Sequence, residues 1–197
     1  MAYYRTTKIS PNRNLQAYII GVAIGDGNLS DPNKRATRLR ITCDNVYPNL
    51  QKKIKNSLQL LFPDNRVSIV ERKGCSDISI YSNHLEKLLG WRADSGPKHK
   101  QKIVIPKWIR NNQVYTTECL RGLIETDGSI YKDRGYLMAT FTTTITGLGR
   151  DVQEMIKLVG FKSNLYKVRT PYNGYRYNVR ISRNVSKFIQ TIQINKS

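Results

Sequence analysis

The sequence has few of the residues that build metal-binding or disulfide frameworks. Its three cysteines, Cys43, Cys75 and Cys119, are far apart and show no CxxC spacing, so we predict neither a zinc site nor disulfides. The only two histidines, His84 and His99, are not in an HxxxH or HNH-like setting, which argues against a histidine-metal nuclease. No apolar run approaches a membrane span or a signal-peptide core. We therefore expect reduced thiols in an intracellular, non-secreted protein that does not enter a membrane.

Acidic residues are also scarce relative to basic ones. The sequence has 33 Lys and Arg against 14 Asp and Glu, which gives a formal net charge of +19 and a pI of about 10.0. Such an excess indicates a polyanionic partner, of which nucleic acid is the commonest. A soluble protein that merely carries extra charge is the alternative. With 39% apolar residues among 197, the chain is typical of a globular protein of one large domain or two small fused ones.

One short segment occurs twice. Residues 19–27 read IIGVAIGDG, and residues 120–128, one hundred and one positions later, read LRGLIETDG. The internal Gly and the final Asp-Gly match, and a small residue precedes the Asp in both copies. A strand-like run and then a helix-like run follow each copy, at residues 28–42 and 47–62 in the first and at 129–144 and 148–161 in the second. Such a duplication indicates two related structural units.

Two further strand-like runs and a closing helix complete each copy, and turn residues separate the two strands. They lie at residues 66–71, 77–81 and 83–89 in the first copy and at 164–169, 175–182 and 185–192 in the second. The predicted fold is α+β, with two pseudo-symmetric α-β-β-α-β-β-α repeats. The predicted divisions are an N-terminal extension (1–14), a first repeat (15–90), a basic linker (91–116) and a second repeat (117–197).

Each copy of the motif predicts a helix that ends at a glycine. Gly27 and Gly128 are expected there because glycine is favoured in the left-handed conformation that follows many helices. Small residues four apart lie on one face of each helix and would let the two backbones approach closely. These small residues are Gly21 and Gly25 in the first copy and Gly122 and Thr126 in the second.

The acidic residue before each glycine is the strongest candidate for chemistry. If the two helices pack side by side in the same direction, Asp26 and Asp127 meet at one end. Two carboxylates at the negative ends of helix dipoles repel each other, so a cation must offset them. Hard oxygen ligands suit Mg²⁺, which could generate a hydroxide and stabilise the leaving oxygen of a phosphodiester. We predict a shared metal site; an ordinary turn or helix cap is the alternative for either Asp-Gly alone.

Both segments resemble the LAGLIDADG motif, the second more closely than the first. The resemblance extends from about Leu15 to the C-terminus, includes the order of flanking elements, and is to the monomeric, two-repeat LAGLIDADG homing endonucleases. In that family the eighth motif residue binds the divalent metal, which implies Asp26 and Asp127 as ligands. The preceding backbone carbonyls, here those of Gly25 and Thr126, assist. The implied cofactor is Mg²⁺, with Mn²⁺ or Ca²⁺ as alternative occupants of the same site.

The family also places a lysine near each metal site, late in each repeat. The lysine-rich run before an Ile-Pro pair resembles that stretch and implies Lys102, and next Lys100, as the catalytic cation; a solvated basic loop is the alternative. In the second repeat Lys196 is the only late candidate. At the sixth motif position the second copy has Glu125 where the first has Ile24, which we interpret as an asymmetric helix interface.

A LAGLIDADG repeat presents a curved antiparallel sheet, and two repeats form a saddle over the DNA major groove. The resemblance therefore implies double-stranded DNA as partner and a monomer with internal pseudo-two-fold symmetry. Strand alternation supports this, because Ile78 and Ile80, like Val179 and Ile181, would face the helices while their neighbours face DNA. The predicted DNA-binding residues are Asn28, Ser30, Lys34, Arg35, Arg38, Arg40, Arg72, Lys73, Asp77, Ser79, Tyr81, Ser129, Tyr131, Lys132, Arg134, Arg169, Tyr172, Tyr175, Arg176, Asn178 and Arg180.

The activity implied by the resemblance is that of a homing endonuclease, or meganuclease. Such an enzyme hydrolyses phosphodiesters across the minor groove of a long pseudo-palindromic site, leaves short 3′ overhangs and serves intron homing. The alternative is a relative that binds nucleic acid without cutting it, either an intron RNA maturase or a DNA-binding regulator, which would not need both carboxylates. A freestanding product, an intron-encoded product and an excised intein domain would look alike over most of the chain.

Overall fold

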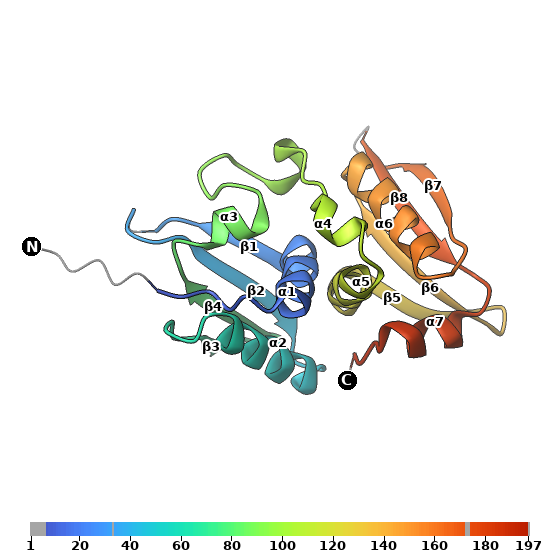
Figure 1. Cartoon of the computed structure of the whole chain (residues 1–197). Helices are drawn as coiled ribbons and strands as arrows, with labels where there is room; N and C mark the ends of the chain where they lie inside the picture. Colours follow the sequence, from blue (N-terminus) through green and yellow to red (C-terminus); the bar gives the residue numbers. More distant parts are fainter. Residues whose placement is uncertain (1–6, 33, 172–173, 197) are drawn as a thin grey trace, which may run out of the picture.

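The computed structural model describes residues 7–32, 34–171 and 174–196 and contains two similar halves (Figure 1). The α-β-β-α-β-β-α order predicted from the sequence occurs twice, so the α+β fold is confirmed. The first half contains α1 (Arg13–Asp26), β1 (Gly27–Ser30), β2 (Arg38–Asp44), α2 (Pro48–Leu61), β3 (Ser68–Glu71), β4 (Cys75–Tyr81) and α3 (Leu85–Leu89). The second contains α5 (Gln113–Asp127), β5 (Gly128–Asp133), β6 (Tyr136–Thr143), α6 (Thr146–Leu158), β7 (Asn164–Arg169), β8 (Tyr175–Ile181) and α7 (Val185–Ile192).

The connection between the halves has structure that the sequence analysis did not predict. It forms a 3-10 helix, η1 (Lys98–Gln101), and a short helix, α4 (Lys107–Arg110). The backbone N–H of Ile105 donates to Asp151 Oδ2 at 2.9 Å, and Arg110 pairs with the same carboxylate at 3.2 Å. The connection is therefore docked on α6, and α5 already begins within the predicted linker. The predicted division into an extension, two repeats and a linker stays a prediction.

The motif helices α1 and α5 pack against each other at the centre of the molecule (Figure 1). Every residue of α1 from Gln16 to Gly25 is buried, as expected for a helix that is apolar on all sides. A Cβ atom added to Gly21 would collide with the backbone oxygen of Cys119, and one added to Gly122 would collide with that of Tyr18. The small residues predicted from the motif are thus what allows the two backbones to touch.

The ends of these helices differ from the expectation of a left-handed cap. Gly27 has φ −78° and Gly128 has φ −85°, both with extended backbone, so the prediction was wrong. The chain instead passes directly from helix into strand. A Cβ atom at Gly27 would overlap the backbone of Ala23, and one at Gly128 would overlap that of Ile124. Glycine is required at both positions because there is no room for a Cβ atom. Each aspartate therefore lies at the junction between a helix and a strand.

The strands of each half form a four-stranded antiparallel sheet, in the orders β1-β2-β4-β3 and β5-β6-β8-β7. One face of each sheet is apolar and covered by helices, with α1 and α2 on the first sheet and α6 and α7 on the second. Ile78, Ile80, Val179 and Ile181 are all buried on these faces, which confirms the predicted alternation. The opposite face of each sheet carries the polar side chains.

Among the described residues, no helix is both long enough and apolar enough to cross a membrane.

Candidate active site and nucleic-acid interface

Asp26 and Asp127 meet where α1 and α5 end. Because the two helices run side by side in the same direction, the carboxyl groups come within hydrogen-bonding reach of each other. Desolvation by the surrounding protein raises the pKa of both groups, and together with the charge of Asp26 it raises the pKa of Asp127 to about 6. Two carboxyls this close cannot both ionise freely. The pair therefore holds a proton more tightly than isolated aspartates and is poised to exchange it for another cation.

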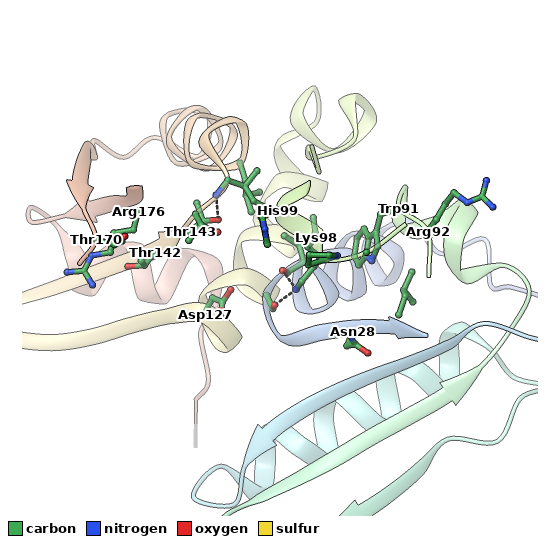
Figure 2. Close-up of a pocket in the computed structure, with 18 residues that line it drawn as sticks. Asn28, Trp91, Arg92, Lys98, His99, Asp127, Thr142, Thr143, Thr170 and Arg176 are labelled. Carbon is green, nitrogen blue, oxygen red and sulfur yellow. Dashed lines mark hydrogen bonds between the residues drawn. The ribbon is translucent and has the colours of Figure 1, made fainter. Parts of the chain in front are cut away.

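Two lysines cap the same helix ends. The ammonium of Lys98, in η1, donates to the backbone oxygens of Ile24 at 2.7 Å and of Gly25 (Figure 2). The ammonium of Lys196 donates to the oxygens of Thr126 at 3.2 Å and Gly128 at 2.8 Å. These oxygens include carbonyls that a helix leaves without an intrahelical partner at its negative end. Both lysines also lower the pKa of the two aspartates, so each helix end attracts a cation.

A cleft of about 540 Å³ opens beside Asp127, between the connection and the second sheet. It runs from Gly25 and Lys98 to Thr142 and Arg176 on the sheet (Figure 2). The cleft therefore connects Asp127 with the polar face of the second sheet. A ligand that lies along that face can reach the Asp127 carboxyl group.

The polar face of the first sheet is built from cross-strand rows. The register aligns Asn28 with Arg40 and Arg40 with Ser79, and the next row aligns Ser30, Arg38 and Tyr81. Side chains of directly opposed residues share a face. The guanidinium of Arg38 donates to Ser30 Oγ at 3.1 Å. All of the residues predicted to bind DNA from β1, β2 and β4 lie on this one face.

Asp77 is buried, although a residue that contacts DNA is expected to be exposed. It is only 3% exposed and pairs with Arg72 and, at 3.9 Å, with Arg40. The hydroxyl of Thr42, a residue that the sequence analysis did not single out, donates to Asp77 Oδ1 at 2.7 Å. The carboxylate thus holds two arginines at the polar face, and the arginines are the groups available to a ligand.

The second sheet has an equivalent polar face. One row aligns Ser129, Thr140 and Arg180, and another aligns Thr142 with Asn178. The Thr142 hydroxyl donates to Asn178 Oδ1 at 3.1 Å, so a threonine and an amide stand where the first sheet has Thr42 and Asp77. The two faces thus differ in charge and chemistry at matching places. Thr140 and Thr142, in β6, were missed because strand alternation was used only in the segments that form β4 and β8.

Comparison with known proteins agrees with this architecture. Residues 15–82 match the family model described as the WhiA LAGLIDADG-like domain, and residues 115–193 match that of the LAGLIDADG-like domain. The chain is a two-repeat LAGLIDADG protein. The two matches begin close to α1 and α5 and leave the connection between the halves outside. This is the resemblance that the duplicated motif indicated.

Solved structures share the fold of this LAGLIDADG protein. The homing endonuclease I-DmoI, in complex with DNA and Mn, superimposes with a TM-score of 0.68 at 21% identity, over 91% of this chain and 96% of that one. The N-terminal LAGLIDADG domain of DUF199/WhiA gives a TM-score of 0.61 at 12% identity, over 97% and 88% of the two chains. These likenesses concern the fold. The expectation of intron RNA as a partner gains no support from them.

A curated relative of the LAGLIDADG chain is a DNA polymerase of Thermococcus sp. (strain GE8). It is 26% identical over 188 residues, which cover 93% of this chain. The chain spans only 11% of the length of that relative. The match therefore concerns one segment of a much longer protein.

The LAGLIDADG site has the chemistry of a hard-cation site. In the described part of the chain, no three His, Cys, Asp or Glu side chains lie close enough together to hold a metal ion, so the two carboxylates would need further oxygen ligands. The carbonyl oxygens of Gly25 and Thr126 are the predicted further ligands, and each accepts a hydrogen bond from a lysine ammonium group. Such an all-oxygen set, completed by water and phosphate, suits Mg²⁺, Mn²⁺ or Ca²⁺. The predicted metal ligands thus fit the metal, and their role stays a prediction.

The lysine beside the first motif is not the one expected. Lys102 ends η1 in a left-handed conformation (φ 49°) and lines a separate cavity, and Lys100 is exposed on η1. Pro97 precedes η1, and it is the first residue of this 3-10 helix, Lys98, that extends to the end of α1. Sequence reasoning identified the right run but could not tell which residue of it reaches the helix end. For the second motif, the only late candidate, Lys196, lies at the helix end, and its catalytic role stays a prediction.

Several predicted DNA contacts lie away from the polar faces. By strand alternation, Lys132, Arg169 and Tyr175 share the helix-covered side with residues such as Val179, and Lys167 stacks on the Tyr175 ring at 3.8 Å. Others lie in the connections between strands, and Tyr172 lies outside the described residues. The residues in these connections are Lys34, Arg35, Arg72, Lys73 and Arg134, of which Lys34 and Arg134 each have φ 50°.

Proposed function

We propose that this LAGLIDADG protein is a divalent-metal-dependent endonuclease that cuts both strands of a long, loosely palindromic DNA site. The observation that carries the proposal is the Asp26–Asp127 pair at the junction of two sheets with polar, basic faces. A purely structural protein gains nothing from two mutually repelling carboxyls at helix C-termini. A nuclease needs such a pair to hold a metal against a phosphate.

The residues that would hold the metal are Asp26 and Asp127 together with the carbonyl oxygens of Gly25 and Thr126. A bound divalent ion there supplies an activated water and neutralises charge on the scissile phosphate. The protein first has to release the proton held by the carboxyl pair, because only the ionised form binds a cation well. Lys98 and Lys196 stand beside the two helix ends, where each can stabilise the negative charge that develops on one phosphate.

DNA would lie across the two polar faces, with its phosphates attracted by the large excess of basic residues. In the first half Arg38 and Arg40 project from the middle of the sheet, and arginine reads guanine well through two hydrogen bonds. In the second half Asn178 stands at the place of Asp77, and amide side chains pair well with adenine. Because the halves present different groups, the two half-sites are expected to differ in sequence.

The first experiment is cleavage of a randomised double-stranded DNA library with Mg²⁺ and with EDTA. Magnesium-dependent cutting at one long site, with short 3′ overhangs, is the expected result. Asp26→Asn and Asp127→Asn should each abolish double-strand cleavage while site-specific binding persists. Full cutting by either variant would refute the metal-site assignment.

A DNA-binding regulator without nuclease activity is the second candidate. It is favoured by the match of residues 15–82 to the WhiA LAGLIDADG-like domain. The retained aspartate pair speaks for the enzyme, since a regulator has no use for it. Site-specific binding of a DNA library with no cutting in Mg²⁺, Mn²⁺ or Ca²⁺ would decide for the regulator.

A further inference from the structure

Glu125 is a buried charge that the proposed chemistry does not use. It lies in α5 against α1, its side chain is fully buried, and Ile24 stands at the matching position of α1. The hydroxyl of Tyr18 donates to its Oε2 at 2.9 Å, and the ammonium of Lys53 in α2 donates to its two oxygens at 2.7 and 2.9 Å. An ionised carboxylate is tolerated in such a place only when it is well paired.

A further partner of Glu125 comes from the end of the chain. The backbone N–H of Asn195 donates to Glu125 Oε1 at 3.0 Å. The next residue, Lys196, places its ammonium on the carbonyl oxygens of Thr126 and Gly128. A hydrogen bond to the buried carboxylate therefore holds the segment after α7 at Asn195. The next residue, Lys196, is the lysine that reaches the aspartate pair.

The lysine of the first half is supported in a different way. Lys98 lies in a loop that is braced by Gln101, whose amide donates to the backbone oxygens of Arg92 at 2.9 Å and Gly96 at 2.7 Å. The carbonyl of the same amide accepts from the N–H of Arg92 at 2.9 Å. This brace is local to the loop, whereas Glu125 depends on Lys53 from the other repeat. The two active-site lysines thus have independent supports.

We propose that Glu125 is a positioning residue that, paired with Lys53, fixes the C-terminal segment so that Lys196 serves the DNA strand cut beside the second motif. The inference rests on the proposed nuclease function. Without the carboxylate, the N–H of Asn195 loses its buried acceptor, and the segment is held less firmly beside Thr126. Small displacements of a charge-stabilising group reduce rates strongly, by up to about 100-fold per ångström. The first half keeps its own lysine and brace.

The test uses the full chain, its selected DNA site labelled separately on each strand, and Mg²⁺. Glu125→Leu should slow one strand by about 10- to 100-fold, so that nicked DNA accumulates, and Lys196→Met should slow the same strand. Gln101→Ala is the matched variant and should slow the opposite strand. Glu125→Gln, which keeps an acceptor for Asn195, should recover part of the rate. If Glu125 acts through Lys196, the double variant Glu125→Leu/Lys196→Met should cut the strand affected by Lys196→Met no more slowly than Lys196→Met alone.

Hydrogen exchange provides a readout that does not depend on cutting. In the metal-free protein, the amides of Asn195 and Lys196 should exchange faster in Glu125→Leu than in the wild type, while those of the Gln101 loop are unchanged. Equal slowing of both strands, independent effects of Glu125 and Lys196, or unchanged exchange would overturn the positioning role. A wild-type protein that binds its site without cutting would instead overturn the proposed nuclease function, and the strand-specific role with it.

Discussion

Replacing Asp127 by Asn should stabilise the metal-free protein although it removes an active-site group. The folded state raises the pKa of Asp127 from 3.8 to about 6, through desolvation and the charge of Asp26. The folded protein therefore binds this proton more tightly than the unfolded chain does. The resulting stability is fully present below about pH 3.8 and is lost as the pH rises through about 6. Asparagine never ionises, so it avoids this loss at neutral pH.

The size of the effect follows from the pKa change. A rise from 3.8 to about 6 corresponds to at most about 3 kcal/mol, at about 1.4 kcal/mol for each tenfold change in proton affinity. The Asp127 side chain is also exposed on one side, and solvent screening reduces the expected gain to about 1 kcal/mol. For a chain of 197 residues this corresponds to a Tm increase of about 2–4 °C.

The assay is thermal unfolding in EDTA at neutral pH and again near pH 4. The Asp127→Asn variant should melt higher than the wild type at neutral pH, and the gap should shrink at the lower pH, where Asp127 of the folded wild type is protonated. Asp31→Asn, in the exposed loop between β1 and β2, is the control and should show no such gap. A variant that is no more stable than the wild type at neutral pH would refute the inference that burial and the charge of Asp26 raise the pKa of Asp127.

Further predictions concern pH, salt, helix packing and the DNA face. Cleavage should fall by about tenfold per pH unit below about 6, as protons compete with the metal for Asp127; a flat profile in rate assays would contradict this. DNA affinity should fall by about 10³–10⁵ between roughly 50 and 200 mM salt in a binding titration if about 6–10 phosphates are contacted. In denaturant unfolding, Gly21→Ala should lower the free energy of unfolding by at least about 1–3 kcal/mol. Gly147→Ala should not lower it, because the added Cβ atom would meet only a side-chain atom at 3.9 Å. Asp77→Asn should relax base preference in one half-site by about 1–3 kcal/mol in a library selection, and unchanged preference would remove Asp77 from the readout.

Much of the architecture followed from the sequence alone. The repeated Asp-Gly motif with small residues four apart was enough to predict two closely packed helices and a meeting of Asp26 and Asp127. Alternation in the strand that contains Ile78 and Ile80 was enough to predict which face of the sheet is buried. These features depend on local periodicity and on a duplication, and both are visible along the chain.

The tertiary structure decided which distant groups reach the site. Lys98, rather than Lys102 or Lys100, caps the first motif helix because the path of η1 after Pro97 sets its direction. Likewise, the partners of Glu125 come from α1, α2 and the last residues of the chain. Such contacts join segments that are far apart in sequence. The geometry of these contacts depends on how the two repeats pack together, so a local pattern of residue types cannot predict it.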